Sequence, residues 1–207
     1  MIFMAKEEQK QEAKDQKSED KKKITQTKAL KGKNWYHIVA PEFFGSKPLG
    51  ETLAVDQDQL KGRVVSASLM ELTEDPSRYY MTMHFKITGF EGQTARTVFH
   101  GHEVTRDFTA RIVQLRTQRL DTNDVLQLKD GKLRVKTVCI SNRRLTESTA
   151  KAVRAELKNL IAESAKGKTI EQFVDGFVTG TLQANIRQTL NKIYPIRHFE
   201  FRKTEVL

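Results

Sequence analysis

The ten residues at 79–88, YYMTMHFKIT, decide the class of fold. Every second side chain belongs to one set, Tyr79, Met81, Met83, Phe85 and Ile87, and the residues between them are mostly polar. A period of two residues is typical of a β-strand, because successive side chains point to opposite faces of a sheet. The stretch therefore predicts a strand with one face toward a core and the other toward solvent or a ligand.

A second stretch, KLRVKTVC at 132–139, repeats the alternation after a hairpin signal at Asp130-Gly131. One predicted face holds the mainly apolar set Leu133, Val135, Thr137 and Cys139, and the other holds Lys132, Arg134 and Lys136. Along a strand these three cations would stand about 7 Å apart, which is close to the spacing of successive phosphates in a nucleic-acid strand.

Further strands are predicted near Val65–Leu69 and at 93–100 and 111–120, and the period changes after Leu145. Apolar residues then recur at helical spacing up to a stop at Gly167, and a capping box at Thr169–Gln172 predicts a second helix. A third helix follows Gly180 and ends before Pro195. Strands first and helices afterwards predict an α+β fold, and short strands separated by turns suit a closed or nearly closed sheet.

The net charge of +10 is concentrated in two parts of the chain. Residues 1–33 contain ten lysines and six acids, and residues 106–144 contain ten basic residues, seven of them arginine, and four acids. Guanidinium groups suit phosphate because their planar fork can bond two oxygens. Basic residues placed in this way predict a nucleic-acid footprint. The first set of predicted RNA contacts is Arg106, Arg111, Arg116, Arg119, Lys132, Arg134, Lys136, Arg143 and Arg144, and the second is Lys21, Lys22, Lys23, Lys28, Lys31 and Lys33.

The charged start of the chain differs in composition from the rest. Between Ala5 and Lys23 there is no aromatic or large aliphatic side chain. Such a segment cannot bury enough apolar surface to offset its ordering entropy, so residues 1–33 are predicted to be a disordered basic tail that orders on a polyanion or stays solvated. Residues 34–207 are predicted to form one α+β RNA-binding domain, strand-rich over 34–144, helix-rich over 145–193, with a terminal strand over 194–203.

Aromatic residues cluster just after the tail, at Trp35, Tyr36, Phe43 and Phe44. They could anchor the first strand in the core or stack on unpaired bases. Trp35 and Tyr36 point to opposite faces of a strand, and Tyr36 is predicted to be the exposed one and an RNA contact.

Several kinds of chemistry are disfavoured. No apolar run is long enough for a membrane helix, and Met1–Met4 is too short an apolar stretch for an export signal. Gly167-Lys168-Thr169 lacks the earlier glycine of a phosphate-binding loop, and His100 and His102, which would share one strand face, lack further metal ligands. Cys139, the one cysteine, is predicted to be a buried and inert thiol. We therefore expect no enzyme activity, metal, cofactor or small-molecule substrate.

The chain resembles a known family over most of the length from Lys33 to Lys203. The sharpest match is FHGHEVTRD at 99–107, with KNWY at 33–36, APEFF at 40–44, GETL at 50–53, LKGRV at 60–64 and KIYPI at 192–196 in order around it. These motifs are similar to those of the archaeal and eukaryotic small-subunit ribosomal protein family S-three-a-e, also called eukaryote-type ribosomal protein S-one. The chain ends soon after Lys203, without the long extension of eukaryotic members, so an archaeal member is expected.

The resemblance implies a structural ribosomal protein without catalytic activity or cofactor, located in the cytoplasmic ribosome. Members of the family bind small-subunit rRNA and neighbouring proteins at the platform, near the mRNA exit, which makes mRNA a further expected neighbour. The implied fold is a β-barrel-like, antiparallel-rich core followed by flanking α-helices. The alternative function is a translation or ribosome-assembly factor that acts through protein–protein contacts.

Overall fold

The computed structural model describes residues 32–207, so Lys21, Lys22, Lys23, Lys28 and Lys31 lie outside the described residues. The strands are β1 (Asn34–Val39), β2 (Pro48–Ala54), β3 (Val64–Ser68), β4 (Met81–Glu91), β5 (Thr94–Val104), β6 (Gln118–Gln127), β7 (Lys132–Ser141) and β8 (Ile196–Val206). The helices are α2 (Leu69–Thr73), α3 (Arg106–Ile112), α4 (Glu147–Ala165), α5 (Ile170–Val178) and α6 (Thr181–Leu190), with short 3-10 turns η1 (Glu42–Phe44), η2 (Gln57–Gln59) and η3 (Pro76–Arg78).

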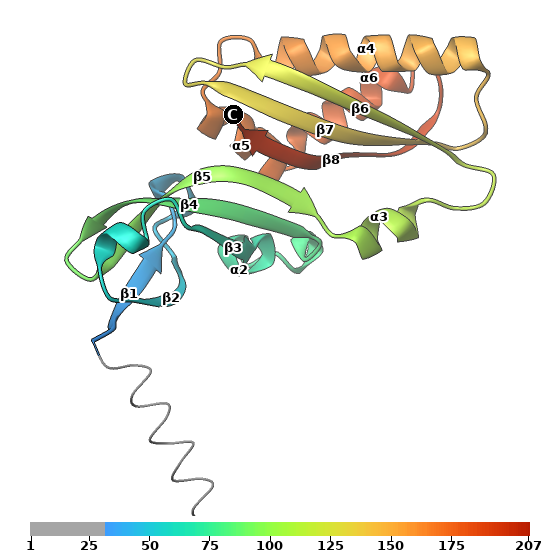
Figure 1. The fold of residues 1–207 in the computed structure, drawn as a ribbon. Helices are drawn as coiled ribbons and strands as arrows, with labels where there is room; N and C mark the ends of the chain where they lie inside the picture. Colours follow the sequence, from blue (N-terminus) through green and yellow to red (C-terminus); the bar gives the residue numbers. More distant parts are fainter. Residues whose placement is uncertain (1–31) are drawn as a thin grey trace, which may run out of the picture.

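The strands form one sheet that branches at β5. Its main order is β2-β1-β5-β8-β7-β6, and β4 pairs with β5 and with β3. Every pairing is antiparallel except that of β1 with β5. Figure 1 shows β6, β7 and β8 beneath helix α4 on one side, and β3, β4 and β5 on the other.

The sheet is open, so the predicted closure into a barrel-like core is wrong, whereas the α+β class and the antiparallel character are confirmed. The terminal strands β2 and β6 have no pairing with each other in the described part of the chain. The helices explain why closure is unnecessary. Helices α4 and α6 contact β6 and β8, and they cover apolar side chains that a barrel would have buried against further strands.

The three predicted helices in the second half are confirmed, and each follows its local signals. In α4 the buried residues recur at three- and four-residue spacing from Ala150 to Ala165. Helix α5 begins with the capping box of Thr169 and Gln172, and Gly180, with a φ of 82°, separates it from α6. Gly167, with a φ of 73°, ends the turn after α4, so the Gly167-Lys168-Thr169 stretch is a helix stop and restart.

Helix α3 replaces part of the strand predicted at 111–120. That strand, β6, begins at Gln118, and residues 106–112 are helical. Phe108 and Ile112 stand four residues apart on one helix face and pack against Val138 and Ile140 of β7. Contact with a distant strand therefore selects the helix, because seven residues contain too few apolar positions to reveal their period.

The prediction for the first strand is wrong for its two aromatic residues. Tyr36 is only 5% exposed and Trp35 is 53% exposed. Tyr36 shares a small apolar cluster with Ile38, Leu60 and Ile87, so it belongs to the core and is withdrawn as an RNA contact. The sequence predicts that Trp35 and Tyr36 lie on opposite faces of β1. Which of the two faces meets the core depends on how β1 packs against distant residues.

The contact between β5 and β8 joins the two groups of strands. It consists of three residue pairs, from Gly101 opposite Glu205 to Glu103 opposite Lys203. The carbonyl oxygen of Thr204 occupies the space that a Cβ at position 101 would need. Glycine is therefore required at position 101 for the strands to approach this closely.

His102 is fully buried beside this contact. Its Nε2 lies 2.8 Å from the carbonyl oxygen of Phe201, which can only accept, so Nε2 holds the proton and donates it. Its Nδ1 then accepts from the Thr204 hydroxyl at 2.7 Å, and the ring stacks on Phe177. Burial lowers the pKa of His102 to about 4, so the ring is neutral near pH 7.

His100 does not share the face of His102, contrary to the predicted arrangement. His84 is opposite Gly101 and Phe85 is opposite Phe99, so His100 is an extra residue in a β-bulge. The bulge shifts the alternation of β5, which leaves His100 half-buried while His102 enters the core.

We predict that Gly101→Ala lowers the free energy of unfolding by about 2 kcal/mol or more, because the added methyl group forces β5 and β8 apart. Gly89→Ala in β4 is the matched control, since nothing lies within 4 Å of its added Cβ. Urea denaturation of both variants measures the effect. Equal stability of the two variants would contradict the close approach of the strands.

We predict that the free energy of unfolding falls as the pH is lowered from about 6.5 to about 4. The pKa of His102 is lower in the folded chain than in the unfolded chain, so the unfolded chain binds more protons in this window. The full effect amounts to about 3 kcal/mol. Denaturant titrations should show a shallower pH dependence for His102→Gln, and an NMR titration of the His102 ring gives its pKa directly. A ring that titrates near 6.5 would contradict the argument.

Candidate functional site

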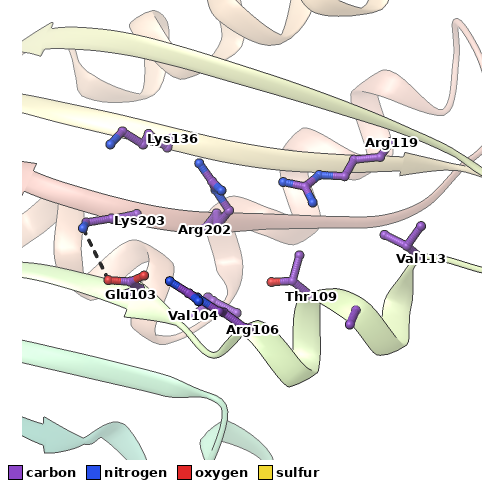
Figure 2. A pocket seen from close by; sticks show the side chains of 10 residues that line it. Glu103, Val104, Arg106, Thr109, Val113, Arg119, Lys136, Arg202 and Lys203 are labelled. Carbon is purple, nitrogen blue, oxygen red and sulfur yellow. Dashed lines mark ion pairs between the residues drawn. The ribbon is translucent and has the colours of Figure 1, made fainter.

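A cavity of about 720 Å³ lies between helix α3 and the face of the sheet that the C-terminal helices leave uncovered. We call it the cationic cleft. Its lining residues are Glu103, Val104, Arg106, Thr109, Ala110, Val113, Arg119, Lys136, Arg202 and Lys203. Figure 2 shows these side chains, which come from β5, α3 and the loop after it, β6, β7 and β8.

Helix α3 forms one wall of the cleft. The chain leaves β5 at Val104, and α3 is held against the sheet by Phe108, which stacks on Tyr80 with ring centres 3.8 Å apart, and by Ile112. The same helix places Arg106 and Thr109 on the lining. The apolar side of a short helix thus determines where its polar side stands.

Strand β7 contributes the cationic face that its alternation predicts. Leu133 and Val135 are buried, whereas Lys132 is exposed and Arg134 and Lys136 are half-buried on the other face. Glu205 of β8 stands between them, with its carboxylate 3.5 Å from the Arg134 guanidinium and 3.7 Å from Lys136 Nζ. The predicted row exists, and one acid partly neutralises it.

A β-bulge in β8 brings two further cations to the cleft. Lys136 is opposite Lys203 and Thr137 is opposite Phe201, so Arg202 is an extra residue between them. Phe201 and Thr204 are buried, and both Arg202 and Lys203 line the cleft. On a regular strand these neighbours would point to opposite faces, and for that reason the sequence did not reveal them as a pair.

The cleft has an excess of positive charge that its own acids do not balance. Its lining holds five cationic side chains and one acid, Glu103, which lies 3.4 Å from Lys203 Nζ. Among residues 32–207, neither Arg106 nor Arg202 has an ion-pair partner. The Nε of Arg202 is buried without a hydrogen-bond acceptor in this part of the chain. A buried donor without a partner costs free energy, which an incoming anion would recover.

Hydrogen bonds move the pKa values of three charged groups in or beside the cleft further from neutral pH. Asp121 accepts two bonds from Arg119, each 2.7 Å long, and these bonds raise the pKa of the guanidinium. The pKa of Lys203 is raised mainly by its hydrogen bond to Glu205, and the pKa of Glu205 is lowered mainly by the same bond. These groups are charged near pH 7 at their ordinary pKa values, and each shift leads further from that pH.

The structure brings together Arg106, Arg119 and Lys136 of the predicted set. Arg111 lies elsewhere on α3, where it donates to the Tyr79 hydroxyl at 2.6 Å and lies 5.7 Å from the centre of that ring. Five other predicted RNA contacts are exposed and lie outside the cleft lining: Lys33, Arg116, Lys132, Arg143 and Arg144. Arg134 is half-buried and also lies outside the lining. Three of the predicted residues thus meet in the cleft, and the others lie outside its lining.

Other predicted features have simple outcomes. Cys139 is buried, and desolvation raises the pKa of its thiol to about 12, as expected of an inert side chain. Over residues 32–207 no group of three or more His, Cys, Asp or Glu side chains is placed to hold a metal ion. No helix in the described range is long and apolar enough to cross a membrane.

Comparison with known proteins decides the family. The model of the ribosomal S3Ae family matches residues 20–207. The chain belongs to the ribosomal S3Ae family. It is 38% identical over 178 residues to the small ribosomal subunit protein eS1 of Methanothrix thermoacetophila, which covers 86% of this chain and 84% of that protein. It is also 38% identical to the protein of that name from Methanothermobacter thermautotrophicus, over 86% and 91% of the two chains, and from Archaeoglobus fulgidus, over 84% of each.

These matches confirm the family that the motifs at 33–64, 99–107 and 192–196 resemble, and its archaeal relatives. They also confirm the non-enzymatic class and the cytoplasmic ribosome as the location, because the family consists of structural ribosomal proteins.

Proposed function

We propose that this chain is a structural constituent of the small ribosomal subunit and that it binds rRNA through the cationic cleft. Family membership supports the ribosomal role. The single observation that supports RNA contact at this place is a cleft with excess positive charge that contains Arg202, whose Nε has no hydrogen-bond acceptor within residues 32–207. A phosphate oxygen is an acceptor of the required charge, and it would satisfy the buried Nε.

The arrangement favours recognition of the RNA backbone. Arg106 and Arg202 present planar forks that can bond two phosphate oxygens, and Lys136 and Lys203 add point charges nearby. Contacts of this kind position a protein on RNA without reading its sequence. RNA would therefore be recognised mainly by shape, with the exposed arginines at 116, 143 and 144 extending the footprint beyond the cleft.

At a finer level, we propose a place on the platform of the small subunit, near the mRNA exit and beside other platform proteins, with residues 34–207 acting as one RNA-binding domain. The resemblance of the motifs supports this location. The lysines at 21–31 stay a prediction from sequence alone. A map of the assembled subunit that placed the chain away from the platform would contradict the location but not the RNA contact.

We predict that Arg106→Gln combined with Arg202→Gln weakens binding to archaeal small-subunit rRNA by about tenfold at 0.1 M salt. Each cation that meets a phosphate contributes to counterion release, so the slope of log affinity against log salt should fall by about one for each residue. Filter binding or fluorescence anisotropy over a salt series measures both quantities.

The control for this variant is Arg63→Gln combined with Arg154→Gln, which removes the same charge outside the cleft. We expect the control to bind nearly as the unchanged chain does. If both variants lost affinity equally, net charge would explain the binding and the cleft would not.

We predict that Glu205→Gln strengthens binding to the same RNA by about threefold at low salt. The substitution removes the carboxylate that lies between Arg134, Lys136 and Lys203, so these cations become available to phosphate. Titration of RNA with the variant and with Glu163→Gln, an exposed acid on α4, measures the difference. Weaker binding of Glu205→Gln would mean that Glu205 orients the cations instead of competing for them.

Association with the subunit distinguishes this function from that of a factor acting through protein contacts. The full chain should sediment with small subunits in high salt and be released after RNase treatment. A chain that stays free of subunits, or remains bound after the RNA is digested, would overturn the proposal.

A further inference from the structure

A second cavity, of about 790 Å³, has the opposite charge to the cationic cleft. It lies where the end of β1 and η1 meet β5, the turn between β6 and β7, and the start of α5. We call it the acidic groove. The lining residues used below are Glu42, Glu91, Arg96, Val98, Asp130 and Glu171.

The acidic groove contains an unpaired length of sheet edge. Strand β1 pairs with one edge of β5 at Thr94–Arg96, and β8 pairs with β5 at Gly101–Glu103. Between them, no strand of the described part of the chain pairs with residues 97–100 on that edge. Strand β4 pairs with the opposite edge of β5. Unpaired strand edges are templates for another extended segment, since their backbone donors and acceptors point outward.

Side chains on this length of edge suit an apolar contact. Val98 is 53% exposed, which is high for an apolar residue inside a strand. Phe99, on the other face of the strand, is buried and holds the backbone against the core. The Thr97 hydroxyl donates to the carbonyl oxygen of Val39 at 2.8 Å, at the point where the pairing with β1 ends and the open edge begins.

The charge of the groove selects a cationic occupant. Its lining holds four carboxylates and one arginine, in a chain whose net charge is +10. Arg96 is already paired with Glu91 at 2.7 Å, and Asp130 accepts from the first backbone N–H of α5 at 3.2 Å. Glu42 and Glu171 are exposed and have no ion-pair partner among residues 32–207. Such a surface repels phosphate and attracts lysine or arginine.

We infer that the acidic groove binds a basic, extended segment of a neighbouring ribosomal protein, which pairs with β5 at residues 97–100. The choice of a ribosomal protein rests on the proposed function, whereas the edge pairing and the charge do not. Four residues of open edge match about 13 Å of extended chain. The side chains of that segment would alternate. A small apolar side chain would contact Val98, and cationic side chains on either side of it in the sequence would point toward Glu42 and Glu171.

The first experiment uses a labelled peptide of alternating lysine and valine and the full chain. Fluorescence anisotropy should show binding at low salt, and the peptide with N-methyl groups on alternate residues should bind about tenfold more weakly, because it cannot donate backbone hydrogen bonds. Equal binding of the methylated peptide would overturn the edge pairing. Absence of binding by the unmethylated peptide would overturn the inference as a whole.

The second experiment changes the groove. Glu42→Lys combined with Glu171→Lys should weaken binding of the peptide by about tenfold, since both exposed carboxylates become repulsive. The matched control is Glu71→Lys combined with Glu163→Lys, which makes the same change of charge at exposed acids outside the groove. Equal losses in the two variants would mean that the peptide responds to net charge, which overturns the assigned site.

The third experiment identifies the occupant in assembled subunits. A photoreactive benzoylphenylalanine at position 98 should cross-link to a lysine- or arginine-rich segment of another ribosomal protein, identified by mass spectrometry. Cross-links only to rRNA, only to residues 1–31 of the same chain, or to nothing would overturn the inference. Sedimentation of the same variant with small subunits is scored separately, so a chain that never enters the subunit contradicts the proposed function and not the peptide site.

Discussion

The close contact between β5 and β8 is the constraint on which the rest of the structure depends. Three residue pairs join the strands, and the backbone of β8 fills the space beside Gly101. His102 completes the contact from the core side, because both of its ring nitrogens are satisfied by β8, by the Thr204 hydroxyl and the Phe201 carbonyl group. The aromatic ring of Phe177 covers the imidazole, so helix α5 closes over the same point.

Both candidate sites follow from the way β8 pairs with its two neighbours, β5 and β7. One edge of β5 is paired with β4 along its length, and the other is divided between β1 and β8. In the part of the chain that the structure describes, β8 meets β5 only at residues 101–103, so an open length remains at residues 97–100, in the acidic groove. Strand β8 also pairs with β7 over most of its length. A bulge at Arg202 shifts the register of this pairing and turns two adjacent cations toward the cationic cleft.

The two cavities favour partners of opposite charge. Among the described residues, Arg106 and Arg202 of the cationic cleft have no ion-pair partner, whereas the acidic groove holds carboxylates around an open strand edge. Phosphate is favoured in the first and opposed in the second, and the reverse holds for a basic peptide. A protein with both surfaces could hold RNA and a neighbouring polypeptide at once, which is the role that an assembly of RNA and many basic proteins requires.

Short-range patterns in the amino-acid sequence were sufficient to predict several features of the structure. The two-residue period predicted β4 and the two faces of β7, capping and glycine signals predicted α4, α5 and α6, and ordered motifs indicated the family. These features depend on residues within a few positions of one another. Only the tertiary structure decided four other features: the open sheet, the burial of Tyr36, helix α3, and the position of both Arg202 and Lys203 on the cleft lining. Each depends on which distant strand lies alongside and in what register, and a register shift of one residue moves a side chain to the other face of a sheet.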